Sequence, residues 1–198
     1  MPNSYTRSLV NRFRHLYRSM LKSGNPLTKP SSIPSMTDSD PRLAAQIRRI
    51  WIPAGRSGTR QTLNLMAHLV RRAANDPEFS GLTLELGISD LFPVTSIDSA
   101  LREHFVYQPE SYEIVRTPQF MLHNWVTQGW FSGDCDDVAT MAAALLLSFG
   151  HSVKFVAIRY SHPTEFEHVF VESDGFRIDP TVPIGTIHRE LERMTLEV

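Results

Sequence analysis

The chain has 198 residues, of which 41% are hydrophobic, enough for one domain with a real core plus an appendage. Its longest apolar run, residues 138–149, is shorter than the roughly 18–20 residues of a membrane-spanning helix, so we expect no transmembrane segment. A single cysteine excludes an internal disulfide, and the N-terminus lacks the apolar core and cleavage site of a secretory signal. We therefore expect a cytoplasmic location rather than secretion.

The formal net charge of −1 conceals an uneven distribution. Residues 1–37 contain six Lys or Arg and no acid, which leaves 14 basic and 21 acidic residues in the remainder. The apolar side chains of this segment share one helical face: Leu9, Val10, Phe13, Leu16, Tyr17, Met20 and Leu21. Its cations lie mainly elsewhere: Arg7, Arg12, Arg14, Arg18 and Lys22. Prolines at 26, 30 and 34 follow. The sequence predicts a basic amphipathic helix and linker over 1–40, and a domain over 41–198.

Four interpretations of this basic helix are open. It docks on its own acidic domain, inserts into a neighbouring subunit, lies on an anionic membrane or nucleic acid, or is a transit peptide. No nucleic-acid-binding motif accompanies it. We favour an assembly arm that binds other subunits through residues 1–37.

The middle of the chain is predicted to be mostly helical. Ser39 and Asp40 before Pro41 indicate a short helix to Ile50, and Thr59 is expected to cap a second helix through Ala74. The pattern of residues 78–95 is ambiguous, and one interpretation is a loop with a short helix near Asp90. Further elements are expected at 96–104 (helix), 105–107 (extended), 108–110 (turn) and 118–126 (helix).

The most informative stretch is Gly133-Asp-Cys-Asp-Asp137, which precedes a helix predicted from Val138 to Phe149. Asp134 is a suitable N-cap, and carboxylates at 136 and 137 suit the positive end of the helix. Cys135 therefore lies where helix N–H groups and the macrodipole favour a thiolate.

Two more polar residues follow on predicted strands. Residues 153–160, 166–172 and 176–179 read as strands, with a hairpin turn at Ser173-Asp174-Gly175. His168 lies in the second strand and Asp179 ends the third, so antiparallel pairing would bring imidazole and carboxylate together. Each residue alone has an ordinary structural explanation. Their order after Cys135 favours a thiol-nucleophile site with a base and an orienting group.

Residues 51–183 resemble the transglutaminase-like cysteine protease superfamily, particularly a version found in tailed-phage genomes. The matching stretches are Gly58–Met66, Val115–Pro118, Gly133–Asp137, Glu167–Phe170 and Ile178–Pro180. The resemblance implies an α+β fold with a papain-like transglutaminase core, in which the catalytic cysteine begins a helix packed on an antiparallel sheet. It implies that Cys135 is the nucleophile, His168 the base and Asp179 its orienter.

The resemblance also implies the chemistry. A thiolate would attack a peptide or side-chain amide of a protein substrate to give a thioester, resolved by water or by an amine. The Cys135 N–H is one expected oxyanion donor, and Trp130 or Gln128 a second; packing against the helix is an equally weighted role for Trp130. The competing hypothesis is a non-catalytic virion or assembly protein that retains the fold. The expected location is therefore cytoplasmic or virion-associated.

No cofactor or metal is expected. Asp134, Asp136 and Asp137 form a cluster of calcium-type ligands, but the loop lacks the ligand spacing of an EF-hand. One cysteine without paired histidines argues against structural zinc, and there is no P-loop.

Overall fold

The computed structural model describes residues 52–85, 88, 94–109 and 114–198. The predicted arm over 1–40, the helix to Ile50 and the short helix near Asp90 lie outside these residues. The helices are α3 (Gly55–Ala74), α4 (Pro77–Glu85), α5 (Val94–His104), α6 (Pro118–Gln128) and α7 (Cys135–Ser148). The strands are β1 (Phe105–Tyr107), β2 (Phe131–Gly133), β3 (Lys154–Arg159), β4 (His168–Ser173), β5 (Phe176–Ile178) and β6 (Glu192–Glu197). The expected mixed α+β class is confirmed.

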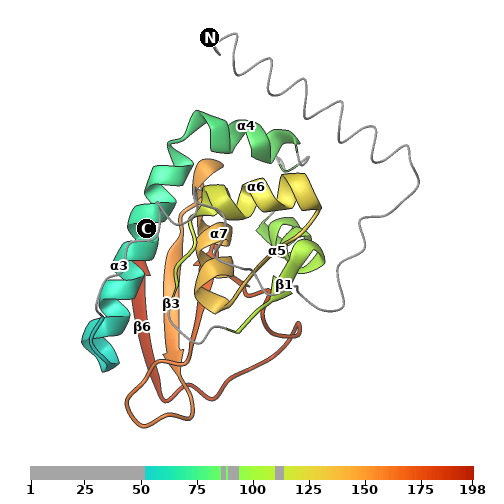
Figure 1. Ribbon diagram of the computed structural model, residues 1–198. Helices are drawn as coiled ribbons and strands as arrows, with labels where there is room; N and C mark the ends of the chain where they lie inside the picture. Colours follow the sequence, from blue (N-terminus) through green and yellow to red (C-terminus); the bar gives the residue numbers. More distant parts are fainter. Residues whose placement is uncertain (1–51, 86–87, 89–93, 110–113) are drawn as a thin grey trace.

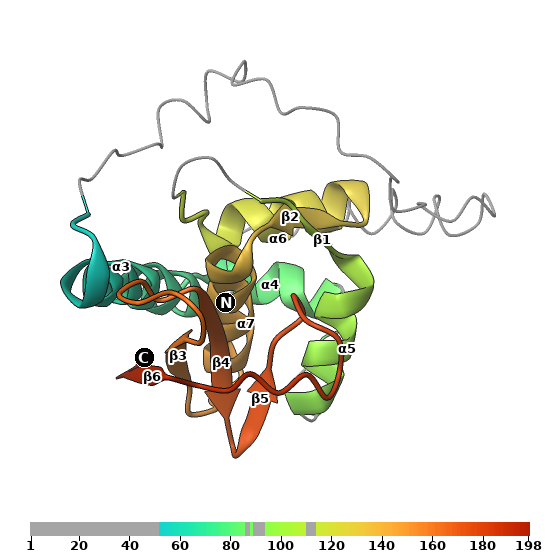
Figure 2. The same ribbon diagram turned by 90° about the horizontal axis from the view of Figure 1, so that it is seen from below.

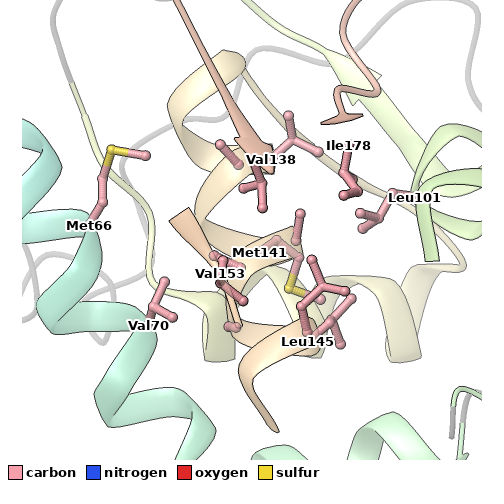
Figure 3. Packing of buried hydrophobic residues seen from close by; sticks show 14 of the residues in the cluster. Met66, Val70, Leu101, Val138, Met141, Leu145, Val153 and Ile178 are labelled. Atoms are coloured by element: carbon pink, nitrogen blue, oxygen red, sulfur yellow. The ribbon is translucent and has the colours of Figure 1, made fainter. Parts of the chain in front are cut away.

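Helix α7 is the centre of the fold. It runs between the sheet on one side and helices α3, α5 and α6 on the others (Figures 1 and 2). Eleven of its fourteen residues are buried. Its Ala- and Leu-rich sequence suits this position, because a helix that contacts protein on every side needs apolar residues all round. Val138, Met141 and Leu145 of α7 pack in one cluster with side chains of α3, α5 and the sheet (Figure 3).

The main sheet is antiparallel, with strand order β5-β4-β3-β6. Alternate residues of β3 belong to different cores: Phe155 and Ala157 join the main core with α7, whereas Val156 and Ile158 join Phe170 in a small second cluster. The predicted hairpin between β4 and β5 is confirmed. Asp174 and Gly175 both have positive φ (50° and 82°), as a two-residue type I′ turn requires.

A second, two-stranded sheet lies beside the start of α7. Strand β1 pairs in parallel with β2, with Tyr107 opposite Gly133, and the Gln108 N–H donates to the Gly133 carbonyl at 2.7 Å. The extended conformation predicted for 105–107 is therefore confirmed. The pairing fixes the chain directly before Cys135.

Three helices differ from the expectations. Helix α3 begins at Gly55 with Ala54 as N-cap, and the Thr59 hydroxyl donates to the Gly55 carbonyl within the helix instead of capping it. Residues 77–85 are helical rather than looped, because the Asp76 carboxylate accepts the Glu78 N–H and Pro77 suits a first turn. Helix α5 begins at Val94, two residues earlier than expected.

Strands β2 and β6 were not predicted. In β6, Met194 and Leu196 face the main core, whereas Arg193, Thr195 and Glu197 are exposed, so the sequence carries a strand's alternation. No helix in the described part of the chain is long and apolar enough to span a membrane.

Candidate active site

Cys135 is the first residue of α7, as the sequence predicted. Asp134 is the N-cap in extended conformation (φ −110°, ψ −156°), and its carbonyl accepts the Val138 N–H at 3.2 Å. The thiol is half-buried. A sulfur at this position lies at the positive end of the helix dipole, which favours the thiolate.

The turn that carries Cys135 is held by the buried carboxylate of Asp137. This carboxylate accepts the Arg116 backbone N–H at 2.6 Å, the Arg116 guanidinium and the Asp134 N–H at 3.4 Å. Gly133 fits closely against it, because a Cβ there would lie 2.3–2.8 Å from Asp137 side-chain atoms. The contact between Arg116 and Asp137 joins the segment before α6 to the start of α7.

His168 and Asp179 are in direct contact. His168 is the first residue of β4 and Asp179 follows β5, so the hairpin brings the two side chains together with Nε2 and Oδ2 2.7 Å apart. Both residues are buried. The predicted pairing of imidazole and carboxylate across adjacent strands is confirmed.

Asp179 is held in its ionised form. Burial raises the pKa of this carboxyl, but the hydrogen bond and charge of His168 and hydrogen bonds from Arg177 and Thr181 lower it to about 2. The Arg177 Nε is 3.1 Å from Oδ2, and the Thr181 hydroxyl donates to Oδ1 at 2.7 Å. An ionised carboxylate only accepts, so Nε2 of His168 carries the proton and Nδ1 is the basic nitrogen of the neutral ring.

Two tyrosines interact with Cys135 from different elements. Burial raises the pKa of Tyr107, and the charges of Cys135 and Asp134 raise it further. Burial, then the charges of Glu167 and Cys135, raise the pKa of Tyr160. Both phenols therefore remain protonated near neutral pH and can donate hydrogen bonds to an anion.

Aromatic contacts connect Tyr160 to His168. The Tyr160 ring stacks on His188 with centroids 4.7 Å apart, and the His188 ring lies 5.7 Å from that of His168. The charge of Cys135 acts on Tyr160, whose ring stacks on His188 beside His168, and His168 contacts Asp179 directly.

The loop that carries Tyr160 is held by Glu167, the neighbour of His168. The Glu167 carboxylate accepts the N–H groups of Tyr160, Ser161 and His162 at 2.6–2.9 Å. Slight desolvation raises the pKa of Glu167, but the Ser161 hydroxyl and these N–H groups lower it to about 2.

The two oxyanion candidates occupy the turn before β2. Gln128 ends α6 and is exposed, and Trp130 is half-buried after Gly129, which caps α6 with a positive φ of 81°. Gln108, which sequence analysis did not select, accepts a hydrogen bond from the Ser132 hydroxyl at 3.0 Å.

The acidic cluster is also at the start of α7. Ligand atoms of Asp134, Asp136 and Asp137 lie within 4.8 Å of one another. The Arg116 guanidinium contacts Asp137 and supplies a positive charge at this cluster.

Several residues around the site were missed in the sequence. Arg177 and Thr181 are two positions from Asp179 on either side, the spacing that puts residues on one face of an extended chain, and this signal was available. Tyr107, Tyr160 and His188 come from separated segments, and nothing local marks them. Protein-family models, curated proteins and solved structures give no match to this chain.

Proposed function

We propose that this protein is a cysteine-dependent acyl-transfer enzyme with a transglutaminase-like, papain-type active site, of the version associated with tailed phages. The observation that carries the proposal is the buried hydrogen bond of 2.7 Å between His168 and Asp179, in a protein whose single cysteine begins the central helix α7. An ionised Asp179 fixes the imidazole and stabilises it when protonated, which is the orienter's role in a nucleophilic triad.

In this mechanism the Cys135 thiol gives its proton to Nδ1 of His168, and Sγ attacks the carbonyl carbon of an amide. The resulting oxyanion accepts a hydrogen bond from the Cys135 N–H, with Trp130 or Gln128 as the second donor. The C–N bond then breaks, and His168 protonates the departing amine to leave a thioester on Cys135. Water or an amine attacks the thioester, gives a proton to His168 and releases the thiolate.

The two tyrosines support this chemistry. Both hydroxyls are protonated near neutral pH and feel the charge of Cys135, so we propose them as hydrogen-bond donors to the negative charge that develops there. Tyr107 is about half-exposed (54%), so its side chain is accessible to a bound molecule.

An activated ester tests the proposal without knowledge of the natural substrate. Mixed with p-nitrophenyl acetate, the protein should release a burst of p-nitrophenolate and gain one acetyl group on its single cysteine, detected by mass spectrometry. Cys135→Ala should abolish the burst, and His168→Ala should slow acylation about 10²–10⁴-fold because the base is lost. Acylation no faster than that of free cysteine would contradict the proposal.

The same experiment distinguishes hydrolysis from transfer. Acetyl-enzyme that decays in buffer alone indicates a peptidase or amidase, whereas decay that requires an added primary amine indicates a crosslinking acyltransferase.

A non-catalytic assembly or virion protein is the competing proposal, and the basic segment 1–37 is the observation that favours it. Removal of residues 1–37 should then abolish binding to partner subunits while Cys135→Ala leaves it intact. Partner binding that survives the deletion would contradict the assembly role.

A further inference from the structure

Helix α5 carries an aspartate and an arginine one turn apart that bind each other and the chain around Asp179. The Arg102 Nε donates to Asp98 Oδ2 at 2.7 Å. The two remaining arginine nitrogens donate to main-chain carbonyls, Nη2 to Asp179 at 2.6 Å and Nη1 to Val182 at 2.5 Å. The second oxygen of Asp98 accepts the Asp179 N–H at 3.1 Å.

These bonds hold Asp179 by its backbone, and they are separate from the bonds to its carboxylate. The Asp179 N–H donates to Asp98, and the Asp179 carbonyl accepts from Arg102. The Arg102 side chain is 22% exposed and the Asp98 side chain 16% exposed. The pair is therefore more enclosed than an ordinary surface ion pair of a helix. Leu101 and Ile178, the preceding neighbours of Arg102 and Asp179, pack in the same core cluster beside these contacts (Figure 3).

The same segment also reaches the cysteine side of the site. Helix α5 ends at His104 and continues without a gap into β1. Strand β1 pairs with β2, and the Gln108 N–H binds the Gly133 carbonyl two residues before Cys135. Residues 98–108 therefore contact the Asp179 segment at one end and the Cys135 segment at the other.

We propose that Asp98 and Arg102 are positioning residues that set Asp179, and through it His168, relative to Cys135. The inference rests on the proposed function of this triad. Neither residue touches the reacting atoms. They act by holding the Asp179 backbone in one position. This matters because displacement of a catalytic group by about 1 Å can cost about 10²-fold in rate.

The test compares Arg102→Met with the wild type and with Arg72→Met, which removes an exposed arginine from the last turn of α3. The readout is the rate of Cys135 alkylation by iodoacetamide from pH 4 to 10, on the full chain. We expect Arg102→Met to slow alkylation at pH 6 about tenfold or more and to move the pH profile towards that of a free thiol. Arg72→Met should match the wild type. A wild-type profile for folded Arg102→Met would overturn the proposal.

Coupling to Asp179 separates positioning from a simple change of charge. If Arg102 acts through Asp179, Arg102→Met should have little further effect on the profile in an Asp179→Asn background. A full additional effect in that background would overturn the proposal. If Arg102→Met does not fold, Asp98→Asn decides: it keeps an acceptor for the Asp179 N–H but weakens the ion pair. A folded Asp98→Asn protein with a wild-type profile would then overturn the inference.

Failure of the proposed function gives a different result. In that case the wild type itself would show an ordinary thiol profile that His168→Ala does not change. Failure of the positioning role alone would leave the wild type and His168→Ala different from each other, with Arg102→Met the same as the wild type.

Discussion

Asp179 is held through both its carboxylate and its backbone. His168, Arg177 and Thr181 donate to its carboxylate, and Asp98 and Arg102 hold its backbone. His168, Arg177 and Thr181 keep this buried carboxyl ionised against the cost of desolvation, with a pKa of about 2. Removing the charge should therefore affect stability as well as reactivity.

We predict that Asp179→Asn lowers the free energy of unfolding by about 2–3 kcal/mol near pH 6. The pKa of Asp179 is lower in the folded protein (about 2) than its ordinary value of 3.8, so its contribution is complete above pH 4 and is lost as the pH falls from 4 to 2. Urea denaturation of the wild type and Asp179→Asn should show the difference narrowing over this window. A difference that stays constant from pH 6 to 2 would contradict the prediction.

At the residue scale, the sequence contained the order and identity of the polar residues but not their supports. The His168–Asp179 contact was predictable because a tight turn at Asp174-Gly175 fixes the hairpin. The role of Arg102 as a support of Asp179 was not predictable, because its carbonyl partners at 179 and 182 lie 77 and 80 residues away in the sequence. Such contacts depend on tertiary packing, which no local pattern encodes.

At the scale of elements, the junction between β2 and α7 is the tightest point near the thiol. A Cβ at Gly133 would lie 2.3 Å from Asp137 Oδ2, and Asp137 cannot easily move because it is buried and bonded to Arg116. Gly133 is therefore required by close packing. Backbone conformation does not require it, because its φ is not in the left-handed region.

We predict that Gly133→Ala costs about 1–3 kcal/mol of stability through overpacking and slows Cys135 alkylation by disturbing the start of α7. Gly81→Ala in α4 is the matched control: its Cβ would meet nothing within 4 Å, and alanine should stabilise this helix by up to about 1 kcal/mol. Thermal unfolding should show a lower melting temperature for Gly133→Ala and an equal or higher one for Gly81→Ala than for the wild type. Equal stability of Gly133→Ala and the wild type would show that this packing is not needed.

Elements with strong periodicity were predicted and weakly patterned ones were not. Helix α7 and the β4–β5 hairpin follow from composition and turn residues. The start of α3 was placed too late: Gly55 and Gly58 lie in its first turn, and Gly58 packs so closely on Pro53 that a Cβ would lie 1.6 Å from the Pro53 carbonyl oxygen. Strand β6 forms an edge of the sheet, and its alternation is weak because Met194 is its one buried residue.

For the whole molecule, the fold brings two halves of the candidate site to the central helix. One half is the β1–β2 pair with Cys135 at the start of α7, and the other is the antiparallel sheet with His168 and Asp179 (Figure 2). Helix α5 bridges them through the Asp98–Arg102 pair at one end and β1 at the other. Reactivity of Cys135 should therefore depend on residues remote from it in sequence.

The most direct test of the account is the pH dependence of Cys135 alkylation by iodoacetamide in the wild type and in His168→Ala. The protein has one cysteine, so the rate reports this thiol alone. We predict an apparent thiol pKa well below the free value of about 8.5 in the wild type, returning towards that value in His168→Ala. A thiol that titrates normally in both proteins would contradict a working thiolate–imidazole pair.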